Sequence, residues 1–258
     1  MKIKIAFPLV ILILFFGVSF QKPQHKPVLY MIGDSTMQNG SGKGSDSLWG
    51  WGSFIGLYIN SDKIDIRNHA KGGRSSRTFL TEGRWDSIMK TLRKGDYVLM
   101  QFGHNDGGEL ADTLRARGSI KGIGEETKEI YNPIRKINET VYTYGHYMRK
   151  YVNDTKAKGA IPIILSPVPR NNFNKDGKIE KDKYGVWANE VSKQTGAYFI
   201  DLNPTVIKKY EDMGPEKVKE FFPKDHTHTN RQGAVLNAES VIKGIRTLKS
   251  CGLRKYIK

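Results

Sequence analysis

Five short apolar segments, separated by stretches with helical spacing, constrain the fold of this 258-residue chain more than any other feature. The apolar segments are 27–32, 64–70, 96–102, 161–165 and 198–202. Each is nearly continuous in apolar residues, as expected for strands of a parallel sheet that is covered on both faces. Helices are predicted over 51–59, 85–92, 141–158, 184–194 and 234–248. Strands that alternate with helices predict βαβ units, and therefore one α/β domain with a five-stranded parallel sheet.

One segment interrupts this alternation. Residues 107–139 are charged, contain several glycines and follow the third predicted strand. We expect a long loop at the carboxyl edge of the sheet. Loops of that length are usually functional or mobile.

The N-terminus has the pattern of a signal peptide over residues 1–19. Two lysines precede an apolar stretch, and small residues follow it, so cleavage is expected near Ser19. The apolar stretch is shorter than the ~20 residues of a membrane-spanning helix, which disfavours a retained anchor. We expect export to the periplasm or medium of a bacterium, without stable membrane insertion after cleavage. Residues 20–27 are expected to form a linker, and residues 28–258 the folded domain.

The composition excludes several classes of protein. The single cysteine, Cys251, excludes an internal disulfide framework and a cysteine-based metal cluster. With 42 basic and 26 acidic side chains the formal net charge is +16, which attracts polyanions such as acidic polysaccharides. The lysines are scattered and do not form a stripe beside aromatic residues, so no nucleic-acid partner is expected. Solubility is the alternative explanation of the charge.

Three polar clusters follow predicted strands, and a fourth precedes the last predicted helix. They are 33–36, 71–74, 103–106 and 224–229. In an open α/β sheet, ligands bind beyond the carboxyl ends of the strands, so these clusters are expected to meet. An esterase needs such parts: a nucleophile, a base, a group that orients the base, and oxyanion donors.

The candidate nucleophile is Ser35, which closely follows the first predicted strand. Its own backbone N–H can face a developing oxyanion, but the same position also suits a helix N-cap. Gly73 can present an unobstructed backbone N–H, or can be a simple turn glycine. The side chain of Asn105 can be a third donor, or can cap the strand end in an Asx-turn.

The candidate base is His228, with Asp225 three residues earlier. A carboxylate at that spacing can lie on the same side of one turn and hold the imidazole in the required tautomer. Two alternatives stay open at this stage. Asp225, His226 and His228 have suitable ligand types for a metal, and the segment can also be an ordinary solvated turn.

Taken in order, the four clusters resemble the sequence blocks of the GDSL or SGNH hydrolase superfamily. Segments 68–79, 101–106 and 225–229 resemble the rhamnogalacturonan acetylesterase family in particular, and the resemblance spans about residues 28–245. The first block reads Gly-Asp-Ser-Thr where the superfamily name has leucine last, a variant that is usual in the acetylesterase branch.

The resemblance implies a three-layer α/β/α, flavodoxin-like fold around the five-stranded parallel sheet. It implies a nucleophile, a base and a base-orienting carboxylate, which are Ser35, His228 and Asp225. It also implies an oxyanion hole formed by the backbone N–H groups of Ser35 and Gly73 and the side chain of Asn105.

The function implied is a secreted serine esterase that removes O-acetyl groups from pectic rhamnogalacturonan without a metal or an organic cofactor. Arg74, Arg77 and Arg84 are candidates for pairing with galacturonate carboxylates, or are helix-surface charges. The alternatives are an esterase of the same fold acting on acetylated xylan or small acyl esters, and a noncatalytic protein that binds polyanions or glycans.

Overall fold

The computed structural model describes residues 25–258. The predicted signal peptide, 1–19, and most of the predicted linker, 20–27, lie outside the described residues.

The central sheet has five parallel strands, as predicted, and their order is β2-β1-β3-β6-β7. Their bounds are β1 Val28–Gly33, β2 Asp65–Asn68, β3 Tyr97–Gln101, β6 Ile161–Leu165 and β7 Tyr198–Ile200. This is the flavodoxin-like strand order, in which the chain moves outward from β1 in both directions. The connections that leave the carboxyl ends of β1 and β3 therefore run in opposite directions. They leave a crevice between them, and ligands of such sheets bind there.

Alternate residues of the strands build two separate cores. Leu29 and Met31 of β1 belong to the cluster on one face, and Tyr30 and Ile32 belong to the cluster on the other. Period-two alternation requires this division, because successive side chains of a strand point to opposite faces. Both clusters are apolar, so the sheet is the middle layer of three.

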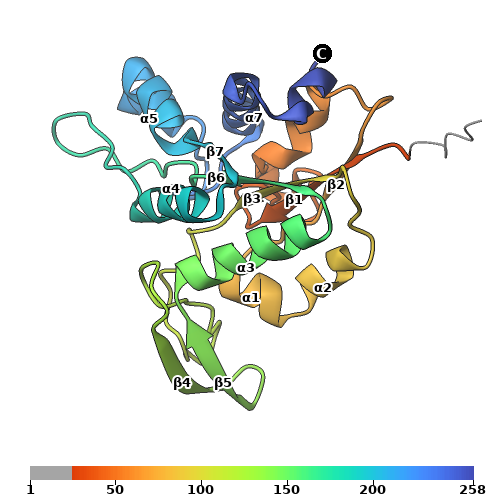
Figure 1. The fold of residues 1–258 in the computed structure, drawn as a ribbon. Coiled ribbons are helices and arrows are strands. Elements are labelled where there is room, and N and C mark those ends of the chain that lie inside the picture. The colour runs from red at the N-terminus through yellow and green to blue at the C-terminus, as the bar shows by residue number, and fades with distance from the viewer. Residues whose placement is uncertain (1–24) are drawn as a thin grey trace, which may run out of the picture.

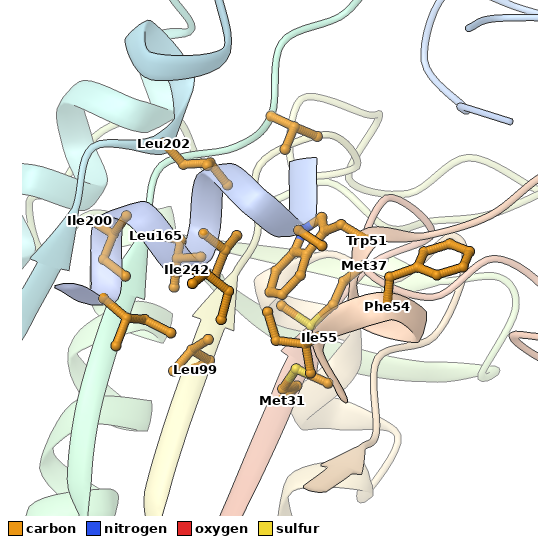
Figure 2. Packing of buried hydrophobic residues seen from close by; sticks show 14 of the residues in the cluster. Met31, Met37, Trp51, Phe54, Ile55, Leu99, Leu165, Ile200, Leu202 and Ile242 are labelled. Atoms are coloured by element: carbon orange, nitrogen blue, oxygen red, sulfur yellow. The ribbon is translucent and has the colours of Figure 1, made fainter. Parts of the chain in front are cut away.

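Helices cover each face, as Figure 1 shows. The face of Leu29 is covered by η2 Trp51–Leu57, α5 Leu202–Met213, α6 Pro215–Lys219, α7 Arg231–Thr247 and η3 Gly252–Tyr256. Figure 2 shows part of that packing, where Trp51 and Ile55 of η2 lie near Met31 of β1. The opposite face is covered by α1 Ser76–Thr81, α2 Arg84–Met89, α3 Tyr144–Ala157 and α4 Lys183–Thr195. The three-layer α/β/α fold predicted from the sequence is confirmed.

The prediction of a long loop over 107–139 is wrong in its second half. Residues Thr127–Asn132 and Ile137–Tyr142 form strands β4 and β5 of an antiparallel hairpin that extends from the body of the domain. Most side chains of β4 are exposed, so no apolar run marks this strand in the sequence. The helix expected from residue 141 begins instead at Tyr144, because β5 ends at Tyr142 and the Thr143 side chain caps the helix by accepting from His146 N.

Three further differences concern local helical structure. The segment expected as a helix over 51–59 is the 3₁₀ helix η2. A second short 3₁₀ helix, η1 Ser45–Ser47, lies in the loop before it. The sequence analysis does not predict α1, α5 or α6; α1 and α6 have only six and five residues, whereas α5 is a full 12-residue helix. No helix within residues 25–258 is both long enough and apolar enough to span a membrane.

Candidate active site

Ser35 lies in a tight turn directly beyond the carboxyl end of β1. The Asp34 carbonyl accepts from the N–H groups of Met37 (3.2 Å) and Gln38 (3.0 Å), and no helix follows. Ser35 is therefore not a helix N-cap, which removes that alternative. The Asp34 carboxylate accepts from Thr36 N at 2.9 Å and from Thr36 Oγ1 at 2.8 Å. These two hydrogen bonds within the turn stabilise its conformation.

Buried hydrogen bonds tie this turn to two other elements. Trp51 Nε1 donates to Gln101 Oε1 at 3.1 Å, and Gln101 Nε2 donates to Thr36 Oγ1 at 2.7 Å. Gln101 is the last residue of β3 and Trp51 is the first of η2, so three elements share one polar network. These bonds favour one geometry, because breaking any of them leaves a further buried polar group unpaired. The turn that carries Ser35 is therefore held by hydrogen bonds to η2 and β3.

The three residues expected to form a catalytic triad meet, although 193 residues separate Ser35 from His228. His228 Nε2 lies 2.8 Å from Ser35 Oγ, and His228 Nδ1 lies 2.7 Å from Asp225 Oδ2. An ionised carboxylate only accepts hydrogen bonds, so Nδ1 carries the imidazole proton and Nε2 is free to accept from the serine hydroxyl. This is the protonation state that a general base requires.

Backbone contacts hold Asp225 in place. Its Oδ1 accepts from Thr227 N at 2.7 Å and from His228 N at 2.8 Å, so the carboxylate closes its own loop. Burial raises the pKa of the Asp225 carboxyl, but the hydrogen bonds from the His228 side chain and from both backbone N–H groups outweigh it. The pKa of Asp225 is therefore lowered, and the group stays ionised at neutral pH.

The expected oxyanion donors line the same cleft as Ser35 and His228, a cavity of about 570 Å³. Gly73 has φ +79°, a left-handed conformation that favours glycine, so its N–H is presented without a side chain in the way. Asn105 is 7% exposed, and its Nδ2 donates to the Arg74 carbonyl at 2.9 Å, which leaves the second N–H of the amide for a ligand. The structure thus gathers Ser35, Gly73 and Asn105 around one space.

His226 lies apart from these contacts. Its side chain is exposed, and its backbone carbonyl accepts from Asn171 N at 2.8 Å. Among residues 25–258, no group of three His, Cys, Asp or Glu side chains is arranged to hold a metal ion. The alternative of a metal site built from Asp225, His226 and His228 therefore has no geometric support, since His228 contacts Asp225 and Ser35 instead.

The chain is similar to known proteins along most of its length. The model of the GDSL-like lipase/acylhydrolase family matches residues 29–241. The chain belongs to this family. It is 34% identical over 219 residues to a rhamnogalacturonan acetylesterase of Emericella nidulans, covering 84% of each protein. It is 30% identical over 227 residues to a probable rhamnogalacturonan acetylesterase of Bacillus subtilis, covering 85% of this chain and 93% of that protein.

A solved structure supports the same assignment. The protein YxiM from Bacillus subtilis superposes with a TM-score of 0.71 at 26% identity, over 90% of this chain and 59% of that chain. The resemblance inferred from the four sequence blocks is confirmed. Because the GDSL-like family consists of lipases and acylhydrolases, this chain is an ester hydrolase.

Of the three arginines expected to bind substrate in this GDSL-family enzyme, only Arg74 lines the cleft. Arg74 lines the cleft, but its Nε donates to Glu82 at 3.0 Å and its Nη1 donates to the Gly72 carbonyl at 2.9 Å. It therefore supports the turn that presents Gly73. Arg84 also donates to Glu82, at 2.7 Å, and does not line the cleft.

The expectation that Arg77 contacts substrate is wrong. Arg77 is 0% exposed, and its Nε and Nη2 donate to the two carboxylate oxygens of Glu139, each at 2.8 Å. Its Nη1 donates to the carbonyls of Leu110 and Gly118, each at 2.9 Å. Segment 107–139 therefore packs over Arg77 of α1, and Arg77 links the β4–β5 hairpin to the rest of the domain.

Sequence reasoning missed three arginines that do line the cleft: Arg115, Arg117 and Arg170. The first two lie in the 107–139 segment, where the run Arg115-Ala116-Arg117 was the available signal. Arg170 follows β6, and it donates to Thr227 Oγ1 at 3.1 Å and to the His104 carbonyl at 3.0 Å. It therefore braces the loop that carries the base against the loop after β3.

Proposed function

We propose that this chain is a secreted serine esterase that removes O-acetyl groups from pectic polysaccharide, with rhamnogalacturonan as the main substrate. The observation that carries the mechanism is the placement of His228 between Ser35 Oγ and Asp225 Oδ2. The names of the two relatives above support the substrate class. The basic lining of the cleft supports an acidic polymer, because only Glu82 among the lining residues is acidic.

The reaction follows from the hydrogen bonds. Ser35 Oγ attacks the acetyl carbonyl carbon while His228 Nε2 takes the hydroxyl proton. When the tetrahedral intermediate collapses, the bond to the sugar oxygen breaks and His228 returns the proton to that oxygen. Water then attacks the acetyl-Ser35 ester with the same histidine as base, and acetate leaves. Asp225 holds the imidazole and stabilises its charged form throughout.

Three donors that line the cleft are proposed to stabilise the oxyanion. The negative charge develops on the acetyl oxygen, where the N–H groups of Ser35 and Gly73 and the amide of Asn105 can donate. Removing one such donor typically costs about 10²–10³ in turnover, so Asn105→Ala should show a loss of that order. The bond from Asn105 to the Arg74 carbonyl fixes the amide before substrate arrives.

The test is acetate release from a panel of acetylated polymers: rhamnogalacturonan, homogalacturonan and xylan. We expect the highest kcat/KM on rhamnogalacturonan, and loss of release from every polymer in Ser35→Ala. Samples deacetylated chemically beforehand serve as blanks. Preference for xylan would refute the pectic substrate while keeping the esterase, and activity retained in Ser35→Ala would refute the mechanism.

Export belongs to the same proposal and rests on residues 1–19. The expectation is a mature N-terminus close to residue 20 in protein recovered outside the cytoplasm. N-terminal sequencing of protein from a bacterial host tests this, and a full-length chain retained in the cytoplasm would refute it.

A further inference from the structure

Arg117 lines the cleft close to the candidate catalytic residues. The same cavity is lined by Ser35 and His228. A methyl group placed on the Gly73 α-carbon would lie only 3.7 Å from Arg117 Nη1. The guanidinium therefore lies next to the glycine proposed as an oxyanion donor, within reach of a ligand whose ester is held at Ser35.

This guanidinium has no partner within residues 25–258, since its side chain donates no hydrogen bond to any of them. Arg117 is half-buried, and burial lowers the pKa of its guanidinium, with the neighbouring Arg115 acting in the same direction. The charges of Asp112 and Asp34 oppose this lowering of the pKa, but neither carboxylate forms an ion pair with Arg117. The Asp112 carboxylate instead accepts from the N–H groups of Leu114, Arg115 and Ala116. A half-buried cation that forms no ion pair is costly unless a ligand supplies a partner.

The other cleft arginines differ in this respect. Arg74 is bound to Glu82 and the Gly72 carbonyl, and Arg170 is bound to Thr227 and the His104 carbonyl. Arg117 alone combines partial burial with an unoccupied set of donors among the arginines of the described cleft.

The backbone around Arg117 is rigid. The Gly118 carbonyl accepts from the buried Arg77, and Gly118 N donates to the Glu109 carbonyl at 3.0 Å. Ser119 donates from N to the Asp106 carbonyl at 2.9 Å and from Oγ to the Asp106 carboxylate at 3.0 Å. A β-carbon at Gly118 would lie 1.9 Å from the Gly108 carbonyl oxygen, so only glycine permits this close approach. Arg117 is thus presented by a preorganised segment, which lowers the entropy cost of binding.

From this geometry we infer that Arg117 is the specificity residue for the carboxylate of a uronosyl unit seated in the cleft. The inference rests on the proposed function and names the contact that selects acidic sugars. The planar guanidinium can bind a carboxylate through two parallel hydrogen bonds, which fixes the orientation of the sugar and not only its charge. That orientation places the acetyl ester against Ser35.

The test compares kcat/KM on three substrates: acetylated rhamnogalacturonan, the same polymer with its carboxyls methyl-esterified, and 4-nitrophenyl acetate. For Arg117→Gln we expect a loss of about 10- to 100-fold on the polymer with free carboxylates, as for one charge-assisted pair, chiefly through KM. The methyl-esterified polymer and the small ester should change by no more than about threefold. Arg117→Lys, which keeps the charge but loses the two-pronged geometry, should recover only part of the loss.

The matched control is Arg246→Gln, which removes an exposed arginine near the end of α7, outside the cleft. It should leave all three substrates unchanged, which separates a local contact from the overall charge. An equal loss on all substrates in Arg117→Gln would overturn the inference in favour of a role at the oxyanion or in folding. Unchanged selectivity for free carboxylates would overturn it as well, while the proposed function stands. A wild-type enzyme that hydrolyses only the small ester would instead refute the proposed function itself, and the inference with it.

Discussion

The sharpest prediction concerns Asp225→Asn. The asparagine retains an oxygen where Asp225 Oδ1 accepts from Thr227 N and His228 N, so the loop should keep its shape. The other carboxylate oxygen, which lies 2.7 Å from His228 Nδ1, is replaced by an NH₂ group that donates. Nδ1 must then accept, the imidazole proton moves to Nε2, and Nε2 can no longer take the proton of Ser35.

The expected size of the loss follows from the exposure of the pair. In a buried triad the same change costs about 10⁴ in kcat. Here the Asp225 side chain is 40% exposed and that of His228 is 27% exposed, so water can partly replace the lost partner. We therefore expect a fall in kcat of about 10²–10³, or about 3–4 kcal/mol in the activation barrier. His228→Ala should lose ~10³ or more, since the base itself is gone.

The assay is steady-state hydrolysis of 4-nitrophenyl acetate at pH 7, with the melting temperature of each variant measured in parallel. His226→Ala is the matched control, because its exposed imidazole is two residues from the base and makes no contact with Ser35 or Asp225. It should keep most of the activity. If Asp225→Asn retained more than a tenth of the wild-type kcat at an unchanged melting temperature, the tautomer argument would be refuted.

Three further predictions concern other parts of the structure. Ser35→Ala should abolish esterase activity with an unchanged melting temperature, because Ser35 Oγ bonds only to the base; residual turnover above background would count against it. Arg77→Met should lower the free energy of unfolding by about 3 kcal/mol in urea titrations, near the lower end for a broken buried pair because Arg135 still faces Glu139 at 3.6 Å; a loss below about 1 kcal/mol would contradict the structural role. Burial raises the pKa of Asp106 from 3.8 to about 6, so the folded state binds its proton more tightly. The free energy of unfolding should therefore fall as pH rises from about 4 to 6, and Asp106→Asn should flatten that slope, which thermal melts across this pH range will measure.

The fold class and the candidate triad could be predicted from local sequence. The strands β1, β3 and β6 are apolar on both faces, and this pattern is independent of where the neighbouring strands lie. Ser35 belongs to a short block that follows β1, and Asp225 and His228 belong to a block that precedes α7. The carboxyl ends of parallel strands meet at one edge of the sheet, so ligands bind there, and the loop before α7 brings the base to the same edge.

The hairpin β4–β5 and its consequences could not be predicted in this way. A strand that is mostly exposed has no apolar run, so Thr127–Asn132 looks like a loop in the sequence. Arg77 has the sequence context of a surface charge. It is nevertheless fully buried, because it packs against Glu139 of β5, 62 residues away. The loop that precedes the hairpin places Arg117 in the lining of the cleft, next to Gly118, whose carbonyl accepts from Arg77. Residue types and their local spacing thus determine the strands and the chemistry, whereas the burial of each arginine and its partner depend on contacts between distant segments, which only the tertiary structure decides.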